Sequence, residues 1–94
     1  MSVYLVSYDL NRTKDYSRLI ARLNEYSAAA RILYSQWLIE SSKSAVDVGN
    51  DLVKYVDGDD AVFVAELTQS CGWRNLMISD ETMNKWFAAA RRCR

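Results

Sequence analysis

Continuous apolar runs alternate along the chain with segments in which apolar residues recur at helical spacing. Residues 2–8 form a nearly continuous run of apolar and β-branched residues, which predicts a strand in the middle of a sheet. From about Thr13 to Tyr26, apolar residues recur every three or four positions and predict an amphipathic helix. A second helix is predicted after Ser44, because Ser44 and Asp47 have the spacing of a helix-capping pair. The first half of the chain therefore mixes strands and helices.

Between these two helices, the stretch Ala28–Glu40 is long for one strand. Its side chains alternate between two faces, which predicts either one bent strand or two strands joined by a tight turn near residues 34–36. Gly58 marks the end of the second helix. A further apolar strand is predicted at Ala61–Leu67.

The last quarter of the chain predicts a loop over residues 68–72, a short edge strand at Trp73–Ile78 and a final helix capped by Ser79. The apolar face of that helix is predicted to contain Met83, Trp86, Phe87 and Ala90. We expect the tryptophans and Phe87 to pack this extension onto the sheet or onto a partner subunit.

The predicted order is strand, helix, strand pair, helix and strand, followed by one more strand and helix. This order predicts an α+β fold, specifically a ferredoxin-like βαββαβ sandwich with an additional C-terminal strand and helix. The 94 residues fit one domain, 1–94, with a core at about 2–67 and a C-terminal extension at about 68–94.

The amino-acid composition limits the catalytic and metal-binding sites that the chain can form. The chain has no histidine, so a Ser-His or Cys-His catalytic pair within one chain is excluded. Its two cysteines do not make a disulfide framework, and we expect free thiols in a reducing compartment. Neither a signal peptide nor a membrane span is predicted, so we expect a cytoplasmic protein. Any metal would be held by carboxylates, which favours Mg²⁺ or Mn²⁺.

The formal net charge is zero, but basic residues dominate positions 11–22 and acidic residues dominate positions 40–66. Lys14, Arg18 and Arg22 recur every four positions and form a basic ridge on the first predicted helix. This ridge favours binding of a phosphate backbone, although charges on an exposed helix face are commonly only solvated.

Asp9 directly follows the first predicted strand and precedes the basic helix. A carboxylate at a strand end could hold a metal ion while nearby cations meet phosphate; the alternative is a helix cap. No second acidic residue lies near Asp9 in sequence, so a metal site would need the Asp9 of a second copy. We interpret the cluster Asp57, Asp59 and Asp60 as a solvated turn, because it lacks the further ligands of a calcium loop.

Residues 34–37 are the second candidate feature. Ser35 could contact a phosphate, and the aromatic residues Tyr34 and Trp37 beside it could stack on a base. The alternative is that both rings pack within the sheet and its core.

Four features taken together resemble the CRISPR-associated protein 2 superfamily, which includes relatives such as virulence-associated protein D. They are a hydrophobic strand ending in Tyr8-Asp9, a basic helix, the aromatic-rich stretch Arg31–Trp37, and a helix ending in an acidic turn before Asp60–Leu67. The resemblance covers roughly residues 2–67. The segment 68–94 is longer than the usual ending of the family.

The resemblance implies a ferredoxin-like fold that dimerises through its sheet. It also implies either a metal-dependent nuclease acting on RNA or double-stranded DNA, or a non-catalytic subunit that holds DNA beside a second protein such as an integrase. Asp9 would be the functional aspartate and would bind Mg²⁺ or Mn²⁺. Ser35-Gln36-Trp37 would take the place of the family's Ser-Val-Phe stretch.

We therefore expect a homodimeric nucleic-acid-processing protein, with Asp9 as the catalytic and metal-binding residue. The residues expected to contact nucleic acid are Arg12, Arg18, Arg22 and Ser35. Two alternatives remain: a non-catalytic nucleic-acid-binding module, and a protein-assembly module that uses the Trp-rich extension.

Overall fold

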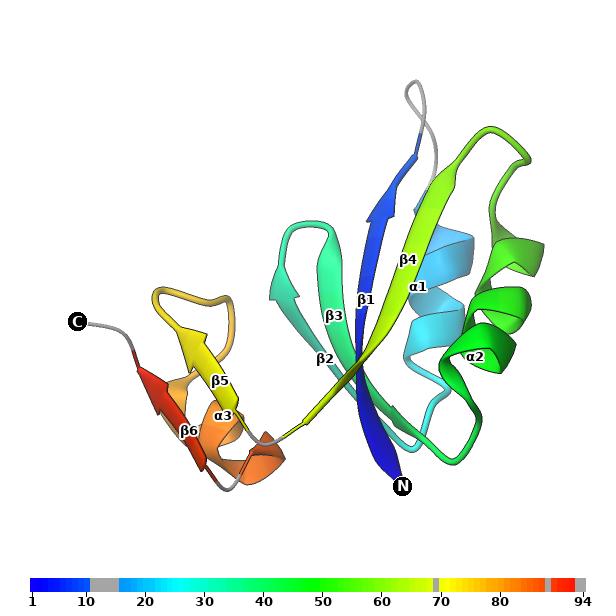
Figure 1. The fold of residues 1–94 in the computed structure, drawn as a ribbon. Helices are drawn as coiled ribbons and strands as arrows, with labels where there is room; N and C mark the ends of the chain where they lie inside the picture. Colours follow the sequence, from blue (N-terminus) through cyan, green and yellow to red (C-terminus); the bar gives the residue numbers. More distant parts are fainter. Residues whose placement is uncertain (11–15, 69, 88, 93–94) are drawn as a thin grey trace.

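The protein is a mixed α+β structure built on one four-stranded antiparallel sheet (Figure 1). The computed structural model describes residues 1–10, 16–68, 70–87 and 89–92. The elements follow the order β1 (Ser2–Asp9), α1 (Ser17–Leu23), β2 (Ala28–Leu33), β3 (Gln36–Ser41), α2 (Ala45–Leu52), a 3₁₀ turn (Val53–Tyr55), β4 (Ala61–Leu67), β5 (Ser70–Trp73), α3 (Asp80–Trp86) and β6 (Ala89–Arg92).

The sheet has the strand order β2-β3-β1-β4. The first strand of the chain is therefore central, and it pairs with β3 and β4 in antiparallel register. β2 and β3 form a hairpin whose turn is Tyr34 and Ser35, so of the two sequence interpretations of this stretch the hairpin is confirmed. Two residues are enough for an antiparallel connection even though neither is glycine or proline.

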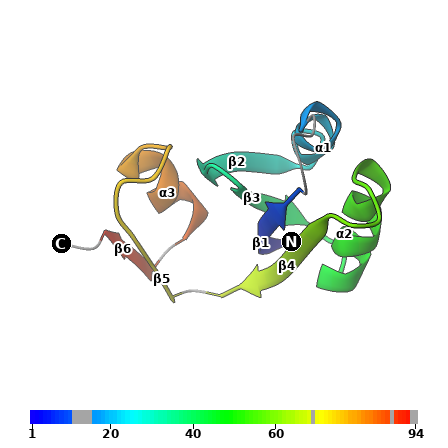
Figure 2. The same cartoon turned by 90° about the horizontal axis from the view of Figure 1, so that it is seen from above.

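One face of the sheet is covered by α1 and α2 (Figure 2). Tyr4, Val6 and Tyr8 of β1 point to this side and are at most 3% exposed. They pack with apolar residues of β3 and of both helices, including Trp37, Ile39, Leu19, Leu23, Val48 and Leu52. The period-2 alternation of β1 is thus what supplies the main core.

The opposite face is covered only in part, by the C-terminal segment (Figure 2). Trp73, Met83 and Phe87 are buried there against Leu38 of β3 and Ile32 of β2. The predicted packing of the extension onto the sheet is therefore confirmed for these residues. The connection after β5 also contacts the sheet directly, because the Met77 amide donates to the Ile32 carbonyl at 2.9 Å.

Several element boundaries differ from the sequence-based ones. The α1 helix ends at Leu23, three residues before the predicted end at Tyr26, and the predicted start at Thr13 lies outside the described residues. Ser44 caps α2 as predicted, with its hydroxyl accepting from the Asp47 amide at 3.1 Å.

The C-terminal extension departs further from the prediction. The strand lies at Ser70–Trp73, within the predicted loop and short of the predicted Trp73–Ile78, and Asn75 has φ of 55°, which is incompatible with a continued strand. α3 is capped by Ser79 as predicted but stops at Trp86, and β6 follows and pairs in parallel with β5. The prediction of a helix through Phe87 and Ala90 was wrong, because Phe87 is already extended.

Candidate functional site

Asp9 is the last residue of β1 and is exposed on the face of the sheet that α1 and α2 leave open. It pairs with Ala61, the first residue of β4, while Ser7 pairs with Phe63. Residues paired in an antiparallel sheet share a face, so these four side chains lie on one surface. The hollow at this place has a volume of about 170 Å³ and is lined by Ser7, Tyr8, Asp9, Ala61, Val62 and Phe63.

Asp9 does not cap the first helix. α1 begins at Ser17, and its N-cap position is Tyr16, which has helical backbone angles and no side-chain cap. The alternative interpretation of Asp9 as the N-cap of the next helix is therefore wrong for this chain. Its exposed position leaves the carboxylate accessible from solvent.

The acidic turn Asp57, Asp59 and Asp60 leads directly into β4. One carboxylate oxygen from each of the three lies within 4.8 Å of the others. Two hydrogen bonds between residues of the turn stabilise it. The Asp60 carboxylate accepts from the Asp57 amide at 2.8 Å, and the Asp60 amide donates to the Asp57 carbonyl at 3.1 Å. Asp60 immediately precedes Ala61, the partner of Asp9.

The pairing of β1 with β4 thus places the backbone of the acidic turn near the end of β1, although Asp9 is not among the three carboxylates that lie within 4.8 Å of one another. The sequence analysis missed this, because more than fifty positions separate Asp9 from Asp60 along the chain. The signal that could have found it is the antiparallel pairing of the first and fourth strands, which sets the end of one beside the start of the other.

Ser35 also lies at this end of the sheet. Its carbonyl accepts from the Tyr8 amide at 3.1 Å, so the β2–β3 turn is fixed to the backbone next to Asp9. The Ser35 side chain is half-buried, whereas the neighbouring Tyr34 ring is 71% exposed. Trp37 is buried, and its indole N–H donates to the Tyr8 hydroxyl at 3.2 Å. The packing interpretation is therefore confirmed for Trp37, while Tyr34 faces solvent.

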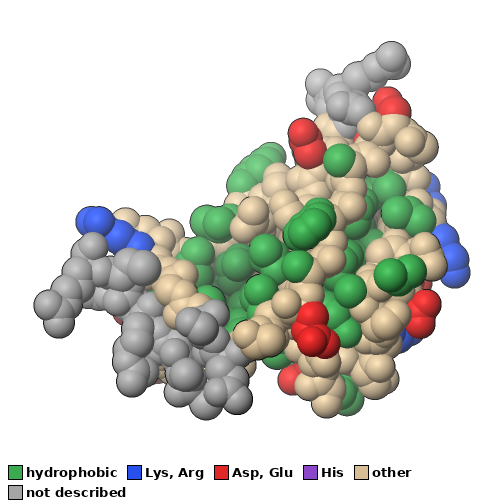
Figure 3. Space-filling model, viewed as in Figure 1, with side chains coloured by type: hydrophobic (Ala, Val, Ile, Leu, Met, Phe, Trp, Pro, Cys, Tyr) green, Lys and Arg blue, Asp and Glu red, His purple; other side chains and the backbone are tan. Residues whose placement is uncertain are grey.

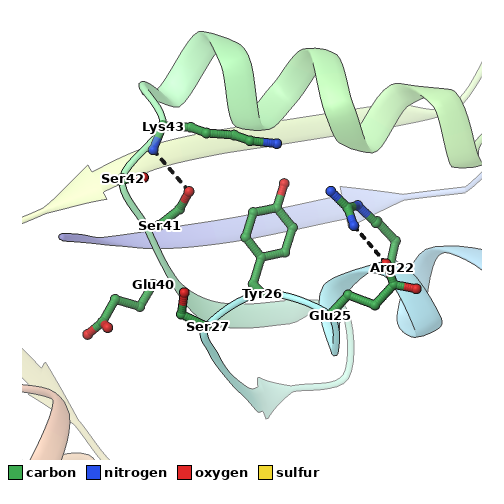
Figure 4. A pocket seen from close by; sticks show the side chains of 8 residues that line it. All are labelled: Arg22, Glu25, Tyr26, Ser27, Glu40, Ser41, Ser42 and Lys43. Carbon is green, nitrogen blue, oxygen red and sulfur yellow. Dashed lines mark hydrogen bonds and ion pairs between the residues drawn. The ribbon is translucent and has the colours of Figure 1, made fainter.

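Arg22 does not join this site. Its guanidinium donates to Asp51 of α2 at 2.8 Å and to Glu25 at 2.7 Å (Figure 4 shows the contact with Glu25). The Tyr26 hydroxyl donates to the same Asp51 oxygen at 2.5 Å. Arg22 therefore links α1 to α2, with its charge compensated by two carboxylates.

The pKa values of this group follow from the contacts. Burial raises the pKa of Tyr26, and its hydrogen bond to ionised Asp51 raises it further. Burial opposes ionisation of Asp51, but the hydrogen bonds from Tyr26 and Arg22 outweigh it and lower the pKa of that carboxyl. The hydrogen bonds to Asp51 and Glu25 raise the pKa of Arg22, so the cation is held firmly in place.

A polar pocket of about 210 Å³ opens beside this group, at the opposite end of the sheet from Asp9 (Figure 4). It is lined by Arg22, Glu25, Tyr26, Ser27, Glu40, Ser41, Ser42 and Lys43. Ser41 pairs with Ser2 at the start of β1. Because β1 spans eight residues at about 3.4 Å each, roughly 24 Å separates the two ends. The structure therefore does not bring Arg22 together with Asp9.

The other predicted nucleic-acid contacts have mixed outcomes. Arg18 is exposed, and its only hydrogen bond within the described ranges is a long one of 3.4 Å to the Lys54 carbonyl. Arg12 lies outside the described residues. Of the predicted site residues, Asp9 and Ser35 lie at one end of the sheet, and Arg22 lies at the other.

The carboxylates of Asp9 and of the acidic turn are ligands of the kind that suits a hard divalent cation. Asp9 and the acidic turn offer only carboxylate oxygens, which Mg²⁺ and Mn²⁺ prefer, and no nitrogen or sulfur ligand of the kind that zinc takes. No family model matches the sequence, and no solved structure matches the fold. Among the described residues, no helix combines the length and the apolar character needed to cross a membrane.

Proposed function

We propose that the chain is a ferredoxin-like sandwich with a C-terminal extension and a member of the CRISPR-associated protein 2 superfamily. Support comes from the element order β1-α1-β2-β3-α2-β4 together with the strand order β2-β3-β1-β4, in which the β2–β3 hairpin separates two strand–helix–strand units.

Within that fold, the proposed activity is metal-dependent hydrolysis of nucleic-acid phosphodiester bonds. The observation that carries it is the position of Asp9, an exposed carboxylate at the end of a central strand with the acidic turn beside it. Asp9 would hold Mg²⁺ or Mn²⁺. When bound, such an ion polarises the phosphoryl oxygen and activates water.

The residues around Asp9 would position the substrate. Ser35 stands on a turn fixed to β1, so its hydroxyl is held near the strand end, where it would donate to a phosphate oxygen. Arg18 would contribute an exposed positive charge. Arg22 has no part in the proposed site, because its two carboxylate partners already compensate its charge.

The test is a cleavage assay on single-stranded RNA and on double-stranded DNA with Mg²⁺ or Mn²⁺, and with EDTA as the metal-free control. Asp9→Asn should abolish cleavage while the melting temperature stays close to that of the wild type. The matched control is Asp47→Asn, an exposed carboxylate on α2 away from the strand end. Cleavage that survives in Asp9→Asn, or that is lost equally in both variants, would refute the assignment.

A non-catalytic binding or assembly module is the second candidate, and one observation favours it. The cleft between the open face of the sheet and the C-terminal segment has a volume of about 490 Å³. Its apolar lining includes Leu5, Ile32, Leu38, Leu67 and Met83. Apolar clefts of this size commonly hold a ligand or a partner. This candidate predicts nucleic-acid or protein binding that persists in Asp9→Asn without any cleavage.

We also propose a homodimer in a cytoplasmic setting. The chain has two cysteines, which do not make a disulfide framework, and this is expected in a reducing compartment. The mass of the protein in solution, measured by light scattering after gel filtration, tests the dimer: a monomer at concentrations well above those of the cleavage assay would refute it.

A further inference from the structure

The apolar cleft between the open face of the sheet and the C-terminal segment is elongated along the strands. Gln36 and Leu67 both line it, and they pair with Ser7 and Val3 of β1. Four residue steps separate Val3 from Ser7, so the cleft extends along the strands by about 14 Å. Figure 3 shows this face, with hydrophobic side chains gathered over the sheet beside the C-terminal segment. The shape suits a chain-like ligand.

The walls of the cleft are held in place by contacts within the chain. Trp73 of β5 lines the cleft, and its indole N–H donates to the Asp80 carboxylate at 3.0 Å, so the ring is fixed. The Met77 amide donates to the Ile32 carbonyl at 2.9 Å and joins the connection after β5 to β2. A cleft with fixed walls loses little conformational freedom when a ligand enters, so the apolar surface that the ligand covers contributes fully to affinity.

Arg74 gives this apolar cleft its one charge. It is the only charged residue among the described residues that line the cleft, and its side chain is exposed. Arg74 makes no ion pair with another residue in the described ranges. A guanidinium beside an apolar surface attracts an anion, and its planar array of donors matches the two oxygens of a carboxylate. The chemistry of the cleft therefore combines a long apolar floor with one anion-binding group.

We propose that the cleft binds a single-chain amphiphile with a carboxylate head, such as a medium-chain fatty acid. The alkyl chain lies along Leu5 and Leu38, which pair in the middle of the floor, and the carboxylate meets Arg74. A singly charged head matches one arginine better than a phosphate monoester does, because that group carries close to two negative charges at neutral pH. The site goes beyond the proposed hydrolysis and does not involve Asp9, which lines a different hollow.

A second copy of the chain is the competing occupant of the cleft. The exposed aromatic residue that a second copy would offer from its own open face is Phe63, which is 63% accessible. One ring would leave most of a cleft of about 14 Å empty, whereas an alkyl chain follows its whole length. Both walls also come from one chain, so the cleft is complete without a partner.

The experiment is isothermal titration calorimetry of the full chain with octanoate, decanoate and dodecanoate, each below its micelle concentration. Every added methylene should tighten the dissociation constant about fourfold. The gain should stop once the alkyl chain is longer than the cleft. Leu67→Gln places an amide in the apolar lining and should weaken dodecanoate binding about tenfold. The matched control is Val46→Gln, at an exposed position on α2, which should bind like the wild type.

The carboxylate head is tested separately from the alkyl chain. Arg74→Ala should weaken dodecanoate binding about threefold, as expected for an exposed ion pair, and should leave binding of the uncharged dodecanol unchanged. Arg74→Lys should keep most of the affinity for dodecanoate. Lys85→Ala, which removes an exposed cation from α3 in the same C-terminal segment, is the control and should bind both ligands like the wild type.

The inference is overturned if the wild type binds none of the three carboxylates, if affinity does not depend on chain length, or if Leu67→Gln binds as well as Val46→Gln. Equal weakening of dodecanoate and dodecanol in Arg74→Ala would refute the role of Arg74. It is also overturned if Phe63→Ala converts a dimer to a monomer and only the monomer binds dodecanoate, because a second copy then fills the cleft. Binding of dodecanoate by a protein that cleaves nothing would support the site and refute only the proposed hydrolysis.

Discussion

Arg22 of α1 and Asp51 of α2 form an ion pair with an N–O distance of 2.8 Å, and this pair joins the two helices that cover the sheet. The Tyr26 hydroxyl donates to the same carboxylate oxygen, so two donors meet on one acceptor. The Asp51 side chain is only 11% exposed, which leaves little room for water to replace a lost partner.

Replacing Asp51 with Asn should destabilise the fold. The variant loses its charge and leaves the Arg22 cation with the exposed Glu25 alone, which we expect to cost about 1–3 kcal/mol of unfolding free energy. Urea denaturation followed by circular dichroism measures this loss. The control is Asp47→Asn, at an exposed position in the first turn of the same helix, which should lower the midpoint much less than Asp51→Asn does; equal midpoints for both variants would contradict the role of the ion pair.

The same carboxylate predicts a dependence of stability on pH. The pKa of Asp51 is lowered in the folded protein, so the folded state favours the ionised form more than the unfolded state does. The contribution of the Asp51 carboxylate to the free energy of unfolding is complete above the unfolded-state pKa of about 3.9. It is lost as the pH falls through the lower, folded-state pKa. The difference in melting temperature between wild type and Asp51→Asn should therefore be constant near neutral pH and shrink below about pH 4. A difference that grew on acidification would show the sign to be wrong.

Replacing Arg18 should affect nucleic-acid binding, whereas replacing Arg22 should affect stability. Arg18→Ala removes an exposed cation, and it should weaken binding to all sequences alike and reduce the slope of log K against log salt by about 1. Arg22→Ala should lower the midpoint of urea unfolding instead, since this side chain belongs to the contact between the helices. Anisotropy titrations over a salt series, with melting curves on the same samples, distinguish the two; an unchanged salt slope in Arg18→Ala would remove Arg18 from the interface.

Met83 should matter for stability although it lies in the C-terminal extension. It is 1% exposed and packs in the cluster with Leu38 of the central sheet, so Met83→Ala leaves a cavity and should cost about 2–5 kcal/mol. Asn84→Ala, at the next and exposed position of α3, is the matched control. A Met83→Ala variant with wild-type stability would mean that the extension unfolds independently of the sheet.

The sequence was most informative where the local pattern and the tertiary context agree. The nearly continuous apolar run in residues 2–8 predicted a central strand, and the Ser44 cap predicted where α2 begins, because both signals lie within a few residues. The C-terminal extension was predicted less well. Gly72 reads as a loop residue, yet it lies within β5, which exists because β6 pairs with it from almost twenty residues away.

The candidate site shows the same limit. Asp9 could be chosen from sequence because it ends an apolar run, but the acidic turn became its neighbour only through the pairing of β1 with β4. Arg22 looked like part of a basic ridge, and its carboxylate partner on another helix could not be seen from spacing along α1. The neighbours of Asp9 and the partner of Arg22 are both set by contacts between segments that are distant in the sequence. The periodicity of residues within one helix or strand carries no information about such contacts.

The central place of β1 has a consequence for how the chain folds. β1 pairs with residues 36–41 on one edge and with residues 61–67 on the other, so during synthesis one edge stays unpaired until β3 has been made and the other until β4 has been made. Pairings of this range carry a large loop-closure cost before they yield any stabilisation, which slows folding relative to a helical protein of the same length. Until β4 arrives, the nascent chain exposes an apolar strand with an unpaired edge, and that interval is when association between unfinished chains is most favoured.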